Sequence, residues 1–145
     1  MHDETMVPGV SRRALLRRVD ARGWLLKLLM REHLSGEGTF GEIYLTAAHP
    51  GHVKGNHYHV RTREWFCVIE GSATLAVQVM ASGVRAELEL SAERPEIVEV
   101  APGVAHAFRN SGSGMMVLFA YADEPYVATQ PDEFRIELLE RASDG

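Results

Sequence analysis

The sequence predicts an all-β domain, a small barrel or sandwich of short antiparallel strands. Short runs rich in β-branched and aromatic residues recur along the chain, and glycine, proline and acidic residues separate them. Hydrophobic residues make up 46% of the 145 positions, which is enough to bury one core. No repeat or linker divides the chain. We therefore expect a single domain over residues 1–145, with its core at about 13–140 and residues 1–12 as a disordered tail.

About eleven strands are predicted, and turn residues bound several of them. The first two flank the turn Asp20-Ala21-Arg22-Gly23. Gly23 also argues against one long helix over residues 11–29, because glycine costs a helix about 1 kcal/mol. The strand at 40–47 is rich in β-formers, and the strand at 73–80 follows the Gly71-Ser72 turn. The last segment fits either a strand or a terminal helix. In chain order the predicted strands are 14–19, 24–30, 40–47, 52–59, 64–69, 73–80, 84–90, 96–100, 105–109, 115–121 and 134–139.

Charge and cysteine content exclude several classes of protein. A net charge of −5 argues against a nucleic-acid binder, which normally carries a basic face. The longest apolar run, Met115 to Ala122, has eight residues and is too short to cross a membrane. A single cysteine, Cys67, excludes an internal disulfide and favours a reducing compartment. We expect a cytoplasmic protein with no nucleic-acid or membrane partner.

Three residues with metal-binding side chains lie close together in the sequence. His57 and His59 are two positions apart, so both point to the same side of a strand. Glu64 follows after four residues, which is enough for the chain to turn and return antiparallel. His106 is a fourth candidate from a later segment. These donors predict a divalent metal ion, with zinc favoured and iron, manganese or nickel as alternatives.

The two faces of the strand that begins at Glu64 have different expected environments. If Glu64 points into the barrel, Phe66 and Val68 line the same inner wall. The alternate side chains then face outward, where a second sheet or a partner subunit must cover them. This apolar outer face favours a homodimer over a monomer. Its members are Trp65, Cys67 and Ile69.

The complete spacing is more specific than the histidine pair alone. It runs Gly51, five residues, His57, one, His59, four, Glu64, six, Gly71, and a second segment runs Gly103, two, His106, three, Asn110. This pattern resembles the two motifs of the cupin superfamily over residues 40–122. One departure is Ala101, where the second motif usually has proline. The resemblance implies a double-stranded β-helix, a jelly-roll-like barrel whose metal ligands are His57, His59, Glu64 and His106.

Further segments resemble one branch of the cupins. The string Lys54-Gly55-Asn56-His57-Tyr58-His59 and the tail Gln130-Pro131-Asp132-Glu133-Phe134 resemble the C-terminal cupin domain of capsular polysaccharide biosynthesis enzymes. The segments 20–24 and 41–44 are similar to the openings of dTDP-4-dehydrorhamnose 3,5-epimerase-like proteins. These resemblances imply a metal-containing epimerase or isomerase that acts through an enolate on a nucleotide-linked keto sugar. Its pathway would be polysaccharide or deoxysugar biosynthesis.

The resemblance also suggests roles for individual residues. Epimerisation needs a base, an electrophile that stabilises the enolate, and a proton donor on the opposite face. Tyr126 is the favoured catalytic tyrosine, ahead of Tyr121 and Tyr58. His57 would be the base only if no metal is bound, because a ligating imidazole has no free lone pair. The expected contacts to the nucleotide sugar come from Arg61, Lys54 and Tyr58.

Two other classes of function fit the same residues. Three histidines and a carboxylate also suit an iron-dependent oxygenase or a small-molecule lyase. The third class is a non-catalytic cupin that binds a ligand as a sensor.

Overall fold

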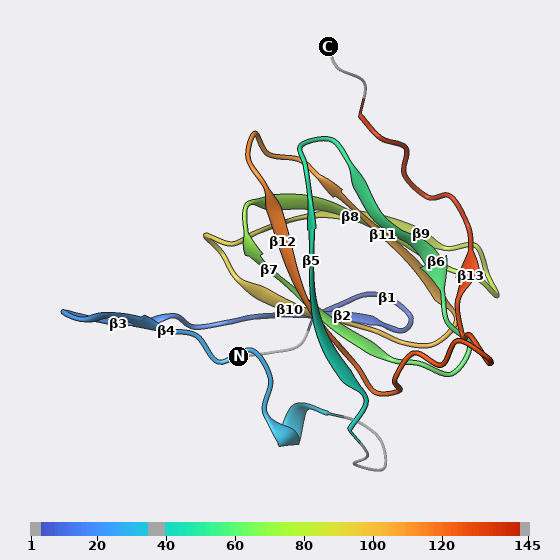
Figure 1. Cartoon of the computed structure of the whole chain (residues 1–145), viewed down its shortest axis with the longest axis horizontal. Helices are drawn as coiled ribbons and strands as arrows, with labels where there is room; N and C mark the ends of the chain where they lie inside the picture. The colour runs from blue at the N-terminus through green and yellow to red at the C-terminus, as the bar shows by residue number, and fades with distance from the viewer. Residues whose placement is uncertain (1–3, 35–39, 143–145) are drawn as a thin grey trace.

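The computed structural model describes residues 4–34 and 40–142 and places two antiparallel sheets around a common interior (Figure 1). The six-stranded sheet has the order β1 (Glu4–Val7), β2 (Val10–Ala14), β10 (Glu96–Val100), β7 (Glu64–Glu70), β12 (Met116–Ala122) and β5 (Glu42–Ala48). The five-stranded sheet has the order β13 (Phe134–Arg135), β6 (Val53–Tyr58), β11 (Val104–Asn110), β8 (Ser72–Val79) and β9 (Arg85–Ser91). This arrangement confirms the predicted all-β barrel.

The remaining elements lie outside the two sheets. β3 (Arg18–Asp20) and β4 (Gly23–Leu25) form a hairpin that projects away from the barrel (Figure 1). A short 3₁₀ helix, η1 (Arg31–His33), follows it. No helix within the described residues is long and apolar enough to cross a membrane.

The alternation predicted for β7 is present in the structure. Phe66 and Val68 point between the sheets and pack in the main core with Leu75 and Phe108 of the facing sheet. The outward residues Trp65 and Cys67 form a second buried cluster with Ile97 and Tyr121. That cluster is covered by the chain's own N-terminal segment, through Leu15, Leu28 and Leu29, whereas we expected a second sheet or a partner subunit.

The beginning of the chain differs from the tail expected at residues 1–12. Residues 4–7 and 10–14 form β1 and β2, and only residues 1–3 of that tail lie outside the described residues. Val10 pairs with Val100 of β10, and both Val7 and Val10 are buried in the core. Burial of these apolar side chains and pairing with a sheet edge fix the segment in place.

The segments at residues 18–25 and 134–135, for each of which a helix was the alternative to a strand, contain short strands. The predicted turn at Asp20–Gly23 joins β3 and β4, but the strands extend for only three residues each. The last segment, which fitted either a strand or a helix, contains the strand β13, and β13 pairs with β6 over two residues.

Candidate functional site

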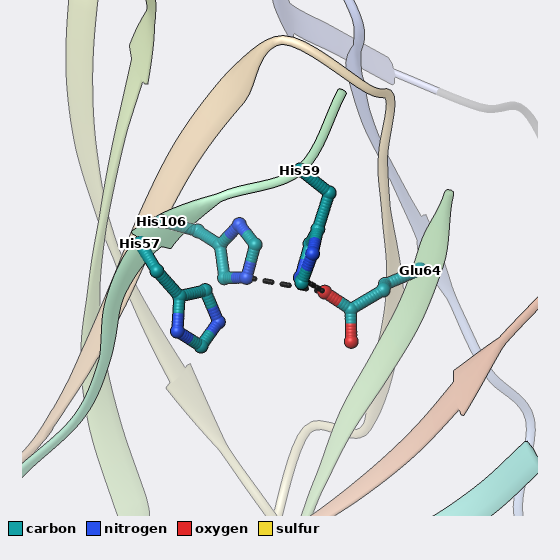
Figure 2. Close-up of side chains that lie close together, drawn as sticks. All are labelled: His57, His59, Glu64 and His106. Atoms are coloured by element: carbon teal, nitrogen blue, oxygen red, sulfur yellow. Dashed lines mark ion pairs between the residues drawn. The ribbon is translucent and has the colours of Figure 1, made fainter. Parts of the chain in front are cut away.

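The four predicted ligands converge between the two sheets, with side chains from β6, β11 and the segment after β6 facing Glu64 of β7 (Figure 2). His57 lies on β6, His59 just after it, Glu64 at the start of β7 and His106 on β11. One ligand atom from each residue can be chosen so that all lie within 4.8 Å of one another. The sequence alone therefore located a true spatial cluster. That these residues hold a metal stays a prediction.

A local irregularity in β6 places the histidines. His57 pairs with His106 across the β6–β11 ladder, and the register shifts immediately after His106. The shift depends on Gly55 and Asn56, which have φ angles of 97° and 61°. A Cβ at Gly55 would lie 2.8 Å from the His106 carbonyl oxygen, so only glycine fits this close approach. Asparagine is among the few other residues that adopt the left-handed conformation readily.

Three atoms at the centre of the cluster are fully buried and have no hydrogen bond within the described chain. They are Nε2 of His59, Nε2 of His106 and Oε1 of Glu64. The Glu64 oxygen lies 2.7 Å from the His59 nitrogen and 3.3 Å from the His106 nitrogen, but neither contact has hydrogen-bond geometry. Buried polar atoms are normally satisfied, so an unsatisfied group of converging donors is the arrangement expected where a cation binds.

The other ring nitrogen of each histidine faces an oxygen atom. Such contacts fix the tautomer and orientation of metal-binding imidazoles, because Nδ1 then carries the proton and Nε2 keeps its lone pair. The three pairs are His59 with the Asp132 carbonyl, His57 with the Glu133 carboxylate at 3.1 Å, and His106 with the Val104 carbonyl at 3.3 Å. Two consecutive residues near the C-terminus thus orient both histidines of the first motif.

Electrostatics differ sharply between the two histidines of the first motif. Burial and the neighbouring His106 and His59 lower the pKa of His57 to about 4. Burial also disfavours the charged form of His59, but the negative charge of Glu64 at 2.7 Å and the nearby Asp132 outweigh burial and raise that pKa to about 9. Burial alone would raise the pKa of Glu64, yet its contacts with His106 and His59 lower it well below its ordinary value. Without a metal, the site therefore holds an imidazolium–carboxylate pair at neutral pH.

The cluster opens into a cavity of about 1010 Å³. Phe66, Phe108 and Leu118 give it an apolar wall, and the predicted substrate contacts Lys54 and Arg61 also line it. Arg61 is paired with Glu124 at 3.4 Å. Carboxylates outnumber these two cations in the lining, so an anionic group is favoured only in the part of the cavity next to Lys54 and Arg61. The acidic members of the lining are Glu42, Glu64, Asp123, Glu124, Asp132 and Glu133.

The three candidate tyrosines have different surroundings. Tyr126 lines the cavity and is 64% exposed, which suits a group that meets a substrate. Tyr121 points to the opposite side of the six-stranded sheet and packs against Trp65. Tyr58 stacks on Phe134 and packs in a separate apolar cluster, outside the cavity lining. Of the three, the geometry favours Tyr126 alone.

Sequence reasoning missed three residues that contact the ligands. Asp132 and Glu133 fall in the tail segment that resembles capsular enzymes, but nothing in the spacing assigned them to the histidines. Tyr44 donates its hydroxyl to Oε2 of Glu64 at 2.9 Å. No sequence signal pairs Tyr44 with Glu64, because β12 separates their strands in the sheet.

Comparison with known proteins gives matches over most of the chain. Residues 18–134 match the polysaccharide biosynthesis C-terminal domain. The chain is 34% identical over 119 residues to the UDP-2-acetamido-2,6-beta-L-arabino-hexul-4-ose reductase of Pseudomonas aeruginosa, an alignment that covers 76% of this chain and 32% of the reductase. The chain thus spans about a third of the length of that relative.

Solved structures resemble the barrel. The capsular polysaccharide assembling protein CapF from Staphylococcus aureus matches with a TM-score of 0.66 and 27% identity, over 86% of this chain and 34% of CapF. ChmJ, a 3'-monoepimerase from Streptomyces bikiniensis, matches with a TM-score of 0.81 and 17% identity, over 95% of this chain and 74% of ChmJ. At that identity the second likeness concerns the fold, and it confirms the predicted cupin barrel.

Proposed function

The chain belongs to the polysaccharide biosynthesis C-terminal domain family, and from this membership we propose that it epimerises or isomerises a nucleotide-linked keto sugar at a metal centre. The observation that carries the proposal is the group of three buried, unsatisfied ligand atoms at the wall of the cavity. The similarity to a hexulose reductase and to a capsular polysaccharide protein supports a nucleotide sugar as the substrate class. It also supports a place in polysaccharide or deoxysugar biosynthesis.

The donor set fits a divalent cation. Three imidazoles and one carboxylate are ligands that zinc accepts, and iron, manganese and nickel also bind such sites. His57, His59, Glu64 and His106 would hold the ion. When bound, it would polarise the substrate carbonyl and stabilise the negative charge that develops on its oxygen.

The protein's own side chains would move the protons. Removal of the hydrogen on the carbon next to the carbonyl sends its electron pair to the carbonyl oxygen, and return of a proton to the other face inverts that carbon. We assign the returning proton to Tyr126, and its exposed side chain in the cavity lining supports this role. We assign removal of the first proton to Glu42, a carboxylate of the cavity lining. Among the described residues of the lining, it is the carboxylate without a hydrogen bond or ion pair.

The nucleotide diphosphate would lie toward the two cations of the cavity. Lys54 has no ion-pair partner within the described chain, so its ammonium group is available to a phosphate oxygen. Arg61 would exchange its contact with Glu124 for a second phosphate oxygen. Tyr58 lies outside the lining, so a role for it in binding would require contact with a distal part of the nucleotide.

A homodimer in the cytoplasm is part of the proposal. The projecting β3–β4 hairpin carries exposed Val19, Trp24 and Leu25, and such an apolar surface is typical of a contact between subunits. Cys67 is buried, and burial raises the pKa of its thiol to about 11, which fits an inert packed residue in a reducing compartment.

Solvent exchange tests the function directly. The purified protein would be incubated in deuterium oxide with a panel of keto-sugar nucleotides, and the products analysed by NMR. We expect deuterium on a carbon next to the carbonyl without oxygen uptake. Oxygen consumption would identify an oxygenase instead, and binding of every candidate without exchange would identify a sensor.

A metal-free mechanism is the second candidate, because Glu133 lies 3.1 Å from Nδ1 of His57. A carboxylate in this position holds the proton on Nδ1 and leaves the lone pair of Nε2 free, and the lowered pKa of about 4 keeps the ring neutral, so a metal-free His57 could accept a proton. Deuterium exchange by protein that was purified without an affinity tag and stripped of metal with a chelator distinguishes the metal-dependent from the metal-free mechanism. Undiminished exchange in the stripped protein that is lost in His57→Asn but kept in Glu42→Gln would assign the base to His57.

A further inference from the structure

Tyr44 contacts the cluster from a strand that supplies none of its ligands. It lies on β5, the edge strand next to β12, and its hydroxyl donates a hydrogen bond of 2.9 Å to Oε2 of Glu64. Oε1 of the same carboxylate faces His59 and His106. The two oxygens of Glu64 therefore have different partners, one a phenol and the other the centre of the cluster.

Tyr44 alone, among the described residues, donates a hydrogen bond to Oε2 of Glu64. Glu64 is 3% exposed, and its Oε1, which faces the two histidines, receives no hydrogen bond within the described chain. A neutral donor next to a buried carboxylate satisfies one oxygen without neutralising the charge that a cation requires.

We propose that Tyr44 is a positioning residue that holds Oε2 of Glu64 away from the cluster, so that Glu64 binds the metal through Oε1 alone. This inference rests on the metal centre proposed above. A carboxylate can bind a metal through one oxygen or through both. A phenol hydrogen bond on Oε2 stabilises the one-oxygen mode and leaves a coordination position open toward the cavity, where a substrate oxygen needs it.

The variant Tyr44→Phe removes only the hydroxyl. Tyr44 is 36% exposed and phenylalanine keeps the shape of its ring, so the variant should fold, which circular dichroism would verify. Tyr121→Phe is the matched control, because it makes the same chemical change on the opposite side of the sheet. The probes are zinc affinity, by competition with a chromogenic chelator, and the visible spectrum of the cobalt(II) form, which reports coordination number.

The expected result is that Tyr44→Phe still binds one ion per chain but about 10-fold more weakly, with a cobalt spectrum shifted toward higher coordination number. Tyr121→Phe should match wild type in both measurements. Wild-type affinity and an unchanged spectrum in Tyr44→Phe would overturn the role of Tyr44 and leave the metal centre intact. Failure of wild-type protein to bind zinc or cobalt would overturn the metal centre itself, and the inference with it.

Discussion

His57 of β6 and His106 of β11 are direct partners across an antiparallel ladder, although they come from separate motifs of the sequence. Their ring centroids are 4.9 Å apart and nearly perpendicular. The register of two central strands, adjusted by the irregularity at Gly55, thus sets the distance between these two imidazoles. A site built on strands is held more rigidly than one built on loops, which is what a metal centre requires.

Loss of a central ligand should abolish metal retention. Nε2 of His106 is buried and has no hydrogen bond within the described chain, so replacement by alanine removes a ligand and breaks no hydrogen bond of that atom. For His106→Ala, which loses the 3.3 Å approach of Nε2 to Oε1 of Glu64, we expect metal content to fall from about one ion per chain to near zero. Mass spectrometry of protein purified without a histidine tag measures it.

The control for this prediction is His52→Ala. His52 precedes β6 and lies outside the cluster, so its replacement should leave the metal content of the protein unchanged. Equal metal content in His106→Ala and wild type would contradict the ligand assignment. Circular dichroism checks that both variants keep the β-fold.

Metal binding should release one proton at neutral pH. In the metal-free protein His59, with its pKa raised to about 9, is protonated, whereas His57, with its pKa lowered to about 4, is neutral. A metal must displace the His59 proton, so the apparent affinity should rise about tenfold for each pH unit from about pH 6 to pH 8. Competition titrations across this range measure the slope, and calorimetry in two buffers counts the protons. An affinity independent of pH would contradict the prediction.

Loss of the proposed base, Glu42, should lower catalysis without lowering metal content. Glu42→Gln removes the carboxylate but leaves all four ligands in place, so metal content should be unchanged. Deuterium exchange into the keto sugar should fall about 100-fold or more, the range in which general bases contribute. Glu70→Gln, a control at the far end of β7 and outside the cavity lining, should exchange normally. Full exchange in Glu42→Gln would assign the base to another group.

The ammonium group of Lys54 should contribute to nucleotide affinity. Lys54→Ala removes an unpaired cation from the cavity, and we expect a free nucleoside diphosphate to bind about 10-fold more weakly. Fluorescence or calorimetric titration with UDP and dTDP measures the effect. Lys27→Ala is the control, since Lys27 lies beside the projecting hairpin and outside this cavity. Equal losses in the two variants would indicate a general charge effect in place of a specific contact.

Local patterns in the sequence predicted most strands and the ligand cluster. Alternation placed Phe66 and Val68 inside, because side-chain direction along a strand depends only on position parity. The spacing of His57, His59 and Glu64 is equally local, but the expected antiparallel return was wrong: β6 and β7 lie in different sheets, so the three side chains meet across the barrel interior. His57 and His106 are far apart in the sequence, so no local pattern predicts that they pair. His106 was predicted to join the cluster only because it lies in the second cupin-like motif.

Contacts between distant segments could not be predicted in the same way. The Tyr44–Glu64 bond depends on how β12 aligns with both β5 and β7, and no pattern in either strand records that alignment. The cover over Trp65 comes from Leu15, Leu28 and Leu29, whose spacing follows neither strand nor helix periodicity. Irregular segments that pack on a sheet leave little signal in the sequence.

Asn56 should be a strong determinant of stability beside the metal site. Its buried side chain accepts hydrogen bonds from the backbone nitrogens of Leu138 and Leu139, at 2.8 and 3.1 Å, and donates to the Leu139 carbonyl at 3.0 Å. It also occupies the left-handed region with φ of 61°. Asn56→Ala loses the bonds and incurs backbone strain, so we expect a loss of about 3 to 4 kcal/mol in the free energy of unfolding.

A second variant separates these two causes. Asn56→Gly also loses the three hydrogen bonds but adopts the same φ without strain, so it should be more stable than Asn56→Ala by about 1 kcal/mol. Urea unfolding of the metal-free proteins measures both values. If the glycine variant were no more stable than the alanine variant, the backbone conformation at Asn56 would not contribute. If neither variant lost stability, the bonds that join β6 to the C-terminal segment would be dispensable.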